Sequence, residues 1–352
     1  MKQKYLFTGN EACAEGALRA GCRFYAGYPI TPQNELIAYM ALHMEERGGV
    51  FIQSESELAA VNMVLGASAA GARAMTSSSS PGISLKQEGI SYMAGCELPA
   101  VIVNVMRGGP GLGNISASQS DYFQATKGGG HGDYRIIVLA PSSVQEMFDL
   151  TFNAFTLADR YNTPVMVLSD GLLGQMMEPL EYDEERAPAG IVDKPWAMKG
   201  SKGNAAKSVK SLYLGDGVLE ALNTKLQKKY GEIKSKEPIA ELYKCDDAEI
   251  VLVGYGSVGR ILMSCVDILR KEGIKAGAVR PITLWPFPCE AIKKLAEKIK
   301  RFFVVEMSAG QMVEDVMLAA EGRTKVDFYG RTGGGIPQEE DIIKEIKKVR
   351  SR

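Results

Sequence analysis

A threonine hydroxyl lies between two prolines in the segment AGYPITPQNE, residues 26–35. Proline fixes its own φ angle and drives the preceding residue toward extended geometry, so Tyr28 and Thr31 are held out of the helical region. The segment follows an apolar stretch that favours a β-strand, and strand-to-helix corners carry ligand sites in open parallel sheets. Thr31 is therefore a candidate functional residue. The alternative is that Thr31 caps a helix that begins at Pro32.

A pair of carboxylates lies in QSESE, residues 53–57. Ser54 and Glu57 have the spacing of a capping box, which predicts Glu57 as the third residue of a helix. The residues that follow are small or apolar, so burial favours the protonated carboxyl while the helix dipole favours the carboxylate. A carboxyl between these two influences is suited to exchange a proton with a ring nitrogen. The residues alone leave both interpretations open.

Three further segments combine polar groups with glycine or serine. VNVMRGGPGLGN (103–114) ends an apolar strand at Arg107. The guanidinium of Arg107 could clamp a carboxylate. The alternative is a surface arginine beside a flexible loop. KGGGHGDYR (127–135) is a second glycine-rich loop and carries His131. TSSSSPG (76–82) ends a strand with hydroxyls and free backbone donors. These groups could bind an anion or the edge of a cofactor, or they could form a serine-capped turn.

Two incomplete cofactor motifs are also present. VGYGSVG (253–259) has the form of the dinucleotide-binding fingerprint, but the strand expected to follow it, IKAGAVRPITLWPFP (274–288), has Arg280 and no acidic residue. LGDG (214–217) has the start of a magnesium motif of thiamine-diphosphate enzymes, without the asparagine that completes it. We predict that Asp216 caps a helix.

The composition limits the kinds of chemistry available. A chain of 352 residues with 45% hydrophobic and 24% charged residues predicts a globular protein of about two domains. A net charge of -1 argues against nucleic-acid binding. His43 and His131 are the two histidines, which disfavours a histidine metal centre or a Ser–His–Asp site. Chemistry then depends on carboxylates, hydroxyls, arginine or a cofactor.

The cysteines form no CxxC pair, so we expect reduced thiols and no metal or iron–sulfur site on this chain. They lie at positions 13, 22, 96, 245, 265 and 289.

Residues 2–9 are too polar for a signal peptide. The most apolar window, 58–76, is interrupted by Asn62 and Arg73 and predicts a buried helix rather than a membrane span. We expect a cytoplasmic protein without membrane contact.

Short apolar runs alternate with amphipathic ones in the first half of the chain. The expected strands are 22–27, 49–53, 73–77, 99–105, 135–140 and 163–169. The expected helices are 10–21, 33–46, 56–71, 83–97 and 143–161. This alternation with near-continuous apolar strands predicts an α/β fold whose parallel sheet is covered on both faces.

The pattern breaks from 186 to 246, where Pro, Gly and Lys without periodicity predict a linker carrying one helix near 217–231. Alternation then resumes. The expected strands are 248–256, 274–280 and 301–307, and the expected helices run to about 272, over 288–300, from 310, and over 339–349. We expect a first domain at 1–185, a linker at 186–246 and a smaller α/β domain at 247–352.

Five segments, in this order along nearly the whole chain, resemble the α subunit of 2-oxoacid:ferredoxin oxidoreductases. They are GNEACAEGALRAGCRFYAGYPITP, QSESE before a small-residue helix, MTSSSSPGISL, VIVNVMRGGPG and VRPITLWPFP. The resemblance implies a first domain that binds the aminopyrimidine end of thiamine diphosphate and a second domain like the C-terminal domain of transketolase. It also implies that Mg²⁺ and the [4Fe-4S] clusters belong to partner subunits, which agrees with the incomplete GDG motif and the dispersed cysteines.

The resemblance also implies roles for individual residues. Glu57 corresponds to the glutamate that bonds the pyrimidine ring nitrogen of the cofactor, and Glu55, two residues earlier, is the alternative. Tyr28, Pro29 and Ile30 correspond to the cofactor-binding corner.

The substrate contacts follow from the same resemblance. Thr31 corresponds to the threonine that hydrogen-bonds the substrate, and the flanking prolines would aim its hydroxyl. Arg107 corresponds to the arginine that grips the oxoacid carboxylate.

The implied partners are β and γ subunits, with or without a ferredoxin-like δ subunit, together with ferredoxin, coenzyme A and a 2-oxoacid. QSESELAAVNMVLGA and MRGGPGLGN resemble the branched-chain type, whereas 2-oxoglutarate-specific α subunits tend to have MEDE in place of QSES. We therefore expect oxidative decarboxylation of 3-methyl-2-oxobutanoate to acyl-CoA and CO₂ with reduction of ferredoxin. The alternatives are a 2-oxoglutarate-specific α subunit, a non-catalytic assembly subunit, and an NAD-linked dehydrogenase built on VGYGSVG.

Overall fold

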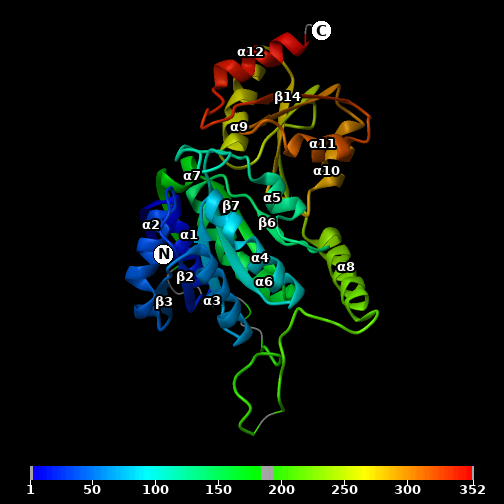
Figure 1. Ribbon diagram of the computed structural model, residues 1–352. Helices are drawn as coiled ribbons and strands as arrows, with labels where there is room; N and C mark the ends of the chain where they lie inside the picture. The colour runs from blue at the N-terminus through cyan, green and yellow to red at the C-terminus, as the bar shows by residue number, and fades with distance from the viewer. Residues whose placement is uncertain (1–2, 184–189, 191–192, 204, 351–352) are drawn as a thin grey trace.

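The computed structural model describes residues 3–183, 190, 193–203 and 205–350. These residues form two α/β units, the first coloured from blue to green and the second from yellow to red in Figure 1. Residues 193–203 and 205–217, which contain no helix or strand, and helix α8 (Val218–Lys236) lie between them along the chain. The domain boundary expected after residue 185 lies outside the described residues.

The first unit is built on a seven-stranded sheet in which the six pairs of neighbours are parallel except for β12 with β6. In spatial order the strands are β12 (Thr283–Trp285), β6 (Ile137–Leu139), β7 (Pro164–Asp170), β5 (Ala100–Met106), β4 (Ala74–Ser78), β2 (Phe24–Gly27) and β3 (Val50–Gln53). Every residue of the apolar strands β5 and β7 is buried, because helices pack on both strands. The predicted α/β fold is confirmed.

The helices of the first unit follow the predicted positions closely, apart from two short ones that were not predicted, α5 and α7. They are α1 (Gly9–Arg19), α2 (Asn34–His43), α3 (Glu57–Ala69), α4 (Ser80–Gly95), α5 (Tyr122–Lys127), α6 (Val144–Tyr161) and α7 (Gly171–Gln175), with a 3₁₀ turn at Glu45–Arg47. Helices α3 and α4 pack against each other, and α3 also packs on β2 and β4. In the described part of the chain, no helix combines the length and the apolar character that a membrane crossing requires.

Two strands near the ends of the first unit were not predicted. β1 (Gln3–Thr8) and β8 (Met177–Tyr182) form a separate antiparallel pair, with Thr8 opposite Met177. Their pairing joins residues about 170 positions apart, and a short sequence window carries no information on such a partner.

The segment IKAGAVRPITLWPFP, in which a strand was expected over 274–280, is divided between two sheets. β11 (Ala276–Pro281) lies in the sheet of the second unit, whereas β12 pairs with β6 in the first sheet, with Thr283 opposite Leu139. The Thr283 hydroxyl accepts a hydrogen bond from the Ile239 backbone N at 2.7 Å just after the chain changes sheet. This crossing strand connects the two units through main-chain hydrogen bonds.

The second unit has a five-stranded sheet, parallel except for one edge strand. In spatial order the strands are β14 (Lys325–Gly330), β13 (Arg301–Glu306), β10 (Ile250–Val253), β11 and the antiparallel β9 (Ala240–Tyr243). Its helices are α9 (Gly256–Lys271), α10 (Cys289–Ala296), α11 (Met312–Ala320) and α12 (Glu339–Arg350). β9 and β14 were not predicted, because both are short edge strands with polar or exposed residues.

Helix α8 corresponds to the one helix expected between the domains. Its N-cap is Gly217, whose φ of 73° places it in the left-handed region. The prediction that Asp216 caps this helix is wrong, because Gly217 takes the cap position and no side-chain cap hydrogen bond forms there.

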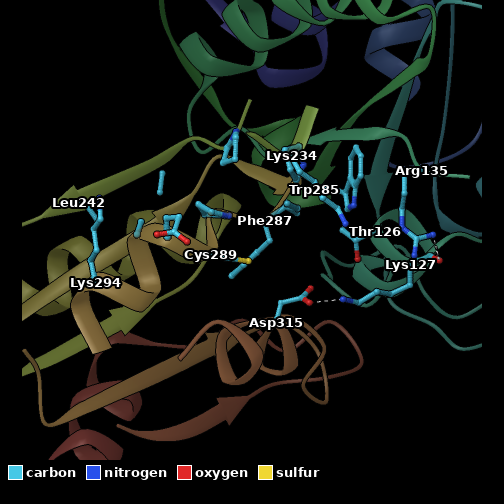
Figure 2. A pocket seen from close by; sticks show the side chains of 17 residues that line it. Thr126, Lys127, Arg135, Lys234, Leu242, Trp285, Phe287, Cys289, Lys294 and Asp315 are labelled. Atoms are coloured by element: carbon cyan, nitrogen blue, oxygen red, sulfur yellow. Dashed lines mark hydrogen bonds and ion pairs between the residues drawn. The ribbon is translucent and has the colours of Figure 1, made fainter. Parts of the chain in front are cut away.

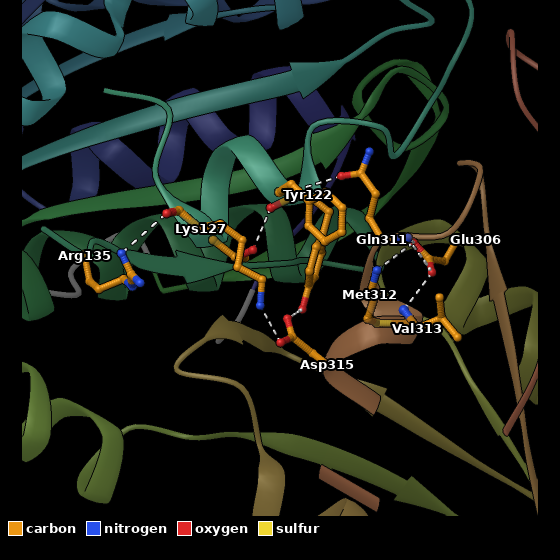
Figure 3. A network of polar contacts seen from close by, with 10 residues as sticks. Tyr122, Lys127, Arg135, Glu306, Gln311, Met312, Val313 and Asp315 are labelled. Atoms are coloured by element: carbon orange, nitrogen blue, oxygen red, sulfur yellow. Dashed lines mark hydrogen bonds and ion pairs between the residues drawn. The ribbon is translucent and has the colours of Figure 1, made fainter. Parts of the chain in front are cut away.

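Glu306, at the end of β13, holds the N-terminus of α11 (Figure 3). Its carboxylate accepts hydrogen bonds from the backbone N of Met312 and of Val313, each at 3.0 Å, and from the Ser308 hydroxyl at 2.9 Å. Burial raises the pKa of Glu306, and these hydrogen bonds oppose the shift. The carboxylate thus replaces the missing intrahelical acceptors of the first turn.

The same helix binds the first unit (Figure 3). The Gln311 side chain accepts a hydrogen bond from the Phe123 backbone N and donates one to the Ser120 carbonyl, both at 2.7 Å. Asp315 accepts a hydrogen bond from the Tyr122 hydroxyl at 2.6 Å. Orientation of α11 by Glu306 therefore also orients the second unit against the first.

We expect Glu306→Ala to lower the free energy of unfolding by about 3 kcal/mol, because the buried N–H groups of Met312 and Val313 lose their acceptor. Glu306→Gln, which retains a carbonyl oxygen, should cost less. Urea unfolding of the purified variants measures both differences. Equal stability of the alanine variant and the unsubstituted protein would contradict this role.

Candidate functional site

Four neighbouring strands, β3, β2, β4 and β5, end at the same edge of the first sheet. The segments that follow these strands carry the residues singled out in the sequence. Thr31 follows β2, Glu57 follows β3, the serines 79 and 80 follow β4, and Arg107 follows β5. The carboxyl edge of an open parallel sheet is where such folds bind ligands.

Thr31 lies in the turn before α2 with a half-buried side chain. Its Oγ1 accepts a hydrogen bond from Asn34 Nδ2 at 3.1 Å. The alternative that Thr31 caps a helix beginning at Pro32 is wrong, because α2 begins at Asn34 and its N-cap is Gln33. The buried Gln33 side chain accepts a hydrogen bond from the Ser77 hydroxyl at 2.6 Å, which fixes this corner to β4.

Arg107 is buried and contacts the Thr31 corner directly. Its Nη1 donates to the Thr31 carbonyl and its Nη2 to the Leu112 carbonyl, both at 3.0 Å. Its Nε is buried and has no hydrogen-bond partner in the described part of the chain. The alternative of a surface arginine is wrong, since the residue is 7% exposed. The structure thus brings Thr31 and Arg107 together.

Glu57 is the first residue of α3. The N-cap is Ser56, whose Oγ accepts a hydrogen bond from the Ala59 backbone N at 3.1 Å. The predicted capping box between Ser54 and Glu57 is wrong, because the helix begins two residues later than the box requires. The Glu57 carboxylate therefore does not serve as a capping group of α3.

The Glu57 side chain is buried against the first turn of α4, whereas Glu55 is exposed. A Cβ atom at Gly82 would lie 2.6 Å from Glu57 Oε1 and 2.0 Å from Ser78 Oγ, so this close approach requires glycine. Among the described residues, none donates a hydrogen bond to the Glu57 carboxylate. Its oxygens are available to a ligand.

The serine run that ends β4 is only partly satisfied. Ser77 bonds Gln33, and Ser80 Oγ donates to Asp121 Oδ2 at 2.6 Å. Ser78 Oγ and Ser79 Oγ are buried and lack a hydrogen-bond partner within the part of the chain that the structure describes. Although Ser79 is the N-cap of α4, its side chain makes no capping bond, so the serine-capped turn is not formed in that way.

Unpartnered buried polar atoms therefore gather at this edge. Besides the two serine hydroxyls, Asn104 Oδ1 and Arg107 Nε lack partners in the described structure. Such a group costs about 1–3 kcal/mol when it stays unsatisfied. A ligand that both donates and accepts hydrogen bonds would satisfy this set.

A cavity of about 610 Å³ opens beside this edge, between the two units. Its walls include Ser80, Pro110 and Asp121 from the first unit and Met307 and Thr332 from the second. Burial raises the pKa of Asp121, and a hydrogen bond from Ser80 opposes the shift. A small molecule in this cavity would contact both units.

Lys86 is a buried residue of this region that the sequence analysis missed. Its side chain is fully buried, and Nζ donates to Thr76 Oγ1 at 3.0 Å and to the Glu57 carbonyl at 3.4 Å. In the sequence, Lys86 lies three residues after Ile83 and four before Ile90, on the apolar face of the helix. A lysine at apolar helical spacing was the available signal.

The glycine-rich turn before α9 packs against the first unit. The buried Asp170 carboxylate lies at the N-terminus of α9, where it accepts a hydrogen bond from the Ser257 hydroxyl at 2.6 Å. A Cβ at Gly256 would lie 3.1 Å from Gln119 Nε2. Burial raises the pKa of Asp170, and the hydrogen bond from Ser257 opposes the shift. A protein carboxylate thus takes the place at the helix that a dinucleotide phosphate would need.

The remaining predicted residues lie at different distances from the edge. Tyr28 and Pro29 are exposed and Ile30 is half-buried, all in the Thr31 corner. His131 is exposed and its ring lies 6.5 Å from the ring of Tyr92, near the C-terminal end of α4 and away from Glu57.

A second cavity, of about 760 Å³, lies between α10 and the loop that follows α5 (Figure 2). Trp285, Phe287, Cys289 and Arg135 are among its walls, and burial raises the pKa of the Cys289 thiol. Thr31, Glu57 and Arg107 line neither cavity, but the walls of the 610 Å³ cavity include Ser80 and Gly109, which belong to the serine run and to the segment of Arg107. The candidate site is therefore the edge of the first sheet.

Comparison with protein families and solved structures identifies the class. Residues 15–237 match the thiamine-diphosphate-binding domain of pyruvate flavodoxin/ferredoxin oxidoreductases, and residues 248–342 match core domain II of pyruvate:ferredoxin oxidoreductase. A solved split-gene transketolase, an inactive β4 tetramer, has the same fold with a TM-score of 0.62 at 14% identity over 98% of both chains. The fold is that of thiamine-diphosphate enzymes.

More similar relatives narrow this class. Two ketoisovalerate oxidoreductase subunits VorB, from Methanothermobacter marburgensis and Methanothermobacter thermautotrophicus, are each 52% identical over 98% of this chain and 97% of their own. The 2-oxoglutarate synthase subunit KorA of Methanothermobacter marburgensis is 39% identical over 98% of this chain and 99% of its own. The chain belongs to the pyruvate flavodoxin/ferredoxin oxidoreductase family, which confirms the resemblance seen in the sequence.

A solved 2-oxoacid:ferredoxin oxidoreductase has a similar structure over nearly the whole length of this chain. The 2-oxoglutarate:ferredoxin oxidoreductase from Magnetococcus marinus, with 2-oxoglutarate, coenzyme A and succinyl-CoA bound, has a TM-score of 0.86 at 28% identity. The match covers 99% of this chain and 65% of that chain.

Proposed function

We propose that this chain is the α subunit of a ferredoxin-dependent oxidoreductase that converts 3-methyl-2-oxobutanoate to acyl-CoA and CO₂ and reduces ferredoxin. The observation that carries the proposal is the buried Glu57 carboxylate, which lies at the carboxyl edge of the first sheet against Gly82 and accepts no hydrogen bond from the described residues. The identity of 52% to two ketoisovalerate oxidoreductase subunits supports the choice of substrate.

The aminopyrimidine ring of thiamine diphosphate fits the groups at this edge. Its ring nitrogens accept hydrogen bonds and its amino group donates them, and the hydroxyls of Ser78 and Ser79 lie buried here without partners among the described residues. We assign Glu57 to hold a proton at a pyrimidine ring nitrogen and the corner 28–30 to contact the ring. When bound, thiamine diphosphate supplies the electron sink for decarboxylation of the oxoacid.

Thr31 and Arg107 are assigned to the oxoacid. Because Thr31 Oγ1 accepts a hydrogen bond from Asn34, its own hydrogen is available to donate to the keto oxygen of the substrate. Two nitrogens of the Arg107 guanidinium bond backbone carbonyls, which holds the charged group still beside Thr31. A fixed cation is suited to bind the oxoacid carboxylate.

A branched-chain substrate agrees better with the charges at this edge than 2-oxoglutarate does. A second cation would be suited to bind the second carboxylate of 2-oxoglutarate. The segments that follow the four strands, residues 28–33, 54–56, 79 and 107–121, all lie within the described ranges and contain Arg107 as their single Lys, Arg or His. The KorA relative and the solved Magnetococcus enzyme keep 2-oxoglutarate as the second candidate.

We propose further that the diphosphate, Mg²⁺ and the [4Fe-4S] clusters are bound by partner subunits, a β and a γ chain with or without a ferredoxin-like δ chain, and that the complex is cytoplasmic. The relatives named as subunits support a complex of this kind. The assignment of 1–185 as the pyrimidine-binding domain, 186–246 as linker and 247–352 as a transketolase C-terminal-like domain is part of the same proposal.

Reconstitution of the complex tests this function. The chain alone should not reduce viologen, and addition of the β and γ subunits should give viologen reduction that depends on coenzyme A and an oxoacid. We expect kcat/KM for 3-methyl-2-oxobutanoate to exceed that for 2-oxoglutarate by at least about 10-fold, because one unpaired carboxylate is excluded from the site. A preference for 2-oxoglutarate would reverse the substrate assignment.

Two other functions remain as alternatives with direct tests. An NAD-linked dehydrogenase would bind NADH, and the carboxylate of Asp170 at the N-terminus of α9 argues against such binding. A fluorescence titration of the chain with NADH tests it. An assembly subunit without catalytic residues would tolerate alanine at Thr31, Glu57 and Arg107 without loss of turnover.

A further inference from the structure

Lys86 has no role in the proposed function, although it is fully buried next to its central residue. Lys86 and Gly82 are four residues apart on α4 and therefore share a helix face. Gly82 lies against the Glu57 carboxylate, and Lys86 reaches the Glu57 backbone carbonyl. The two α4 residues thus contact the first turn of α3 from one side.

A buried ammonium group is unfavourable unless an opposite charge or hydrogen bonds compensate it. Lys86 has two hydrogen-bond acceptors, Thr76 Oγ1 and the Glu57 carbonyl. Burial lowers the pKa of Lys86 to about 8, and the charge of Glu57 opposes this shift. The charge of Lys86 is therefore coupled to Glu57 and can be lost in a mildly alkaline solution.

Among the described residues, the other elements packed against α4 offer no comparable charge to Lys86, and the Asp121 carboxylate is bound to Ser80 at the first residue of the helix. Helix α3 contributes Glu57, and β4 contributes the Thr76 hydroxyl. Strand β5 has no acidic or basic residue, and the carboxylate of β7, Asp170, is bound to Ser257. Tyr134, whose pKa burial raises, contacts the neighbouring Gln87 instead. Glu57 is the charged group that acts on Lys86.

We propose that Lys86 is a positioning residue whose buried ammonium fixes the first turn of α3 against β4 and balances the Glu57 carboxylate, so that this carboxylate faces the cofactor ring. The proposal rests on the proposed function, because the role of Glu57 is assigned there. Its consequence is a pH dependence: as the pH rises through about 8, Lys86 loses its charge and Glu57 loses its support.

Titration of the assembled complex with thiamine diphosphate and Mg²⁺ measures this directly, without turnover. We expect the affinity of the unsubstituted complex to fall by about 10-fold between about pH 7 and pH 9.5, as the lysine charge is lost. Lys86→Met should bind the cofactor about 10-fold more weakly at pH 7 and show no such fall. The near-ultraviolet circular dichroism of the bound cofactor reports its amino and imino tautomers. This signal should change with pH in the unsubstituted complex and should not change with pH in Lys86→Met.

A matched control is Lys229→Met, because Lys229, on helix α8, is also largely buried and is paired with the carboxylate of Glu97 at 3.1 Å. It should leave the pH profile of cofactor binding unchanged. If Lys86→Met does not assemble, Lys86→Gln, which retains a donor for Thr76, replaces it with the same readouts.

The cycle of Lys86→Met, Glu57→Gln and the double variant separates this inference from the proposed function. If Lys86 acts through Glu57, Lys86→Met should have no further effect on cofactor affinity in the Glu57→Gln background. If the effects of the two substitutions on cofactor affinity are additive, Lys86 has a structural role only. The same conclusion follows if Lys86→Met lowers the melting temperature and leaves the pH profile unchanged. A fully active Glu57→Gln complex would instead overturn the proposed function itself.

Discussion

Glu57→Gln is expected to lower the kcat of the reconstituted complex by about 10³-fold, because an amide cannot hold and return the proton at the cofactor ring nitrogen. The substitution preserves shape, so the close packing of the side chain against Gly82 and Ser78 should persist. Viologen reduction with saturating oxoacid and coenzyme A measures the loss. Gel filtration of the same sample checks that the complex still assembles.

Glu55→Gln is the matched control, since Glu55 is two residues away and exposed. It should leave kcat within about 2-fold of the unsubstituted value, as is usual for surface changes. If Glu55→Gln were inactive and Glu57→Gln active, the alternative assignment of the cofactor glutamate would hold.

The second large effect is expected at Arg107. Arg107→Lys retains the charge but loses the planar group whose two nitrogens bond the Thr31 and Leu112 carbonyls. We expect kcat/KM for the oxoacid to fall by about 100-fold, mainly through a higher KM, because the carboxylate is bound less firmly and less well oriented. Initial rates over a range of oxoacid concentrations separate the two constants.

Arg135→Lys provides the control for this substitution. Arg135 also donates to two backbone carbonyls, those of Lys127 and Tyr134, but it lines the other cavity (Figure 2). Its replacement should not change the KM for the oxoacid. An unchanged KM in Arg107→Lys would show that this arginine only holds the corner at Thr31 in place.

The architecture of the first unit could be predicted because its strands are continuous apolar runs between amphipathic helices. β5 and β7 are buried along their whole length, and such runs leave little choice of structure. β9 and β14 lie at sheet edges, where polar residues face solvent and the hydrophobic pattern fades. The return of β12 to the first sheet depends on contacts with β6, which lies about 140 residues earlier.

The edge of the sheet at which the candidate residues lie was predictable, whereas their local geometry was not. The order of the strands brings Thr31, Glu57 and Arg107 to one edge, and each of them follows a predicted strand. The expected helix 56–71 starts one residue before α3, but the capping box of Ser54 and Glu57 is wrong, because both Ser54 and Ser56 can cap a helix and the sequence does not choose between them. The contact between Glu57 and Gly82 depends on how α3 packs on α4, which no local pattern encodes.

The burial of Lys86 also could not be predicted from its own segment. A lysine in the middle of an amphipathic helix is expected on the solvent face, and its neighbours at helical spacing are apolar. Its burial is explained by the Thr76 hydroxyl and by the first turn of α3, both of which come from other elements.

We propose that a carboxylate of this chain binds a thiamine diphosphate whose phosphates are held by a partner subunit. The decisive experiment is a crystal structure of the assembled complex with the cofactor. We expect a pyrimidine ring nitrogen within hydrogen-bond distance of Glu57, with the ring close to Ser78 and Gly82. A cofactor ring bound elsewhere, with the Glu57 carboxylate in contact with protein alone, would contradict it.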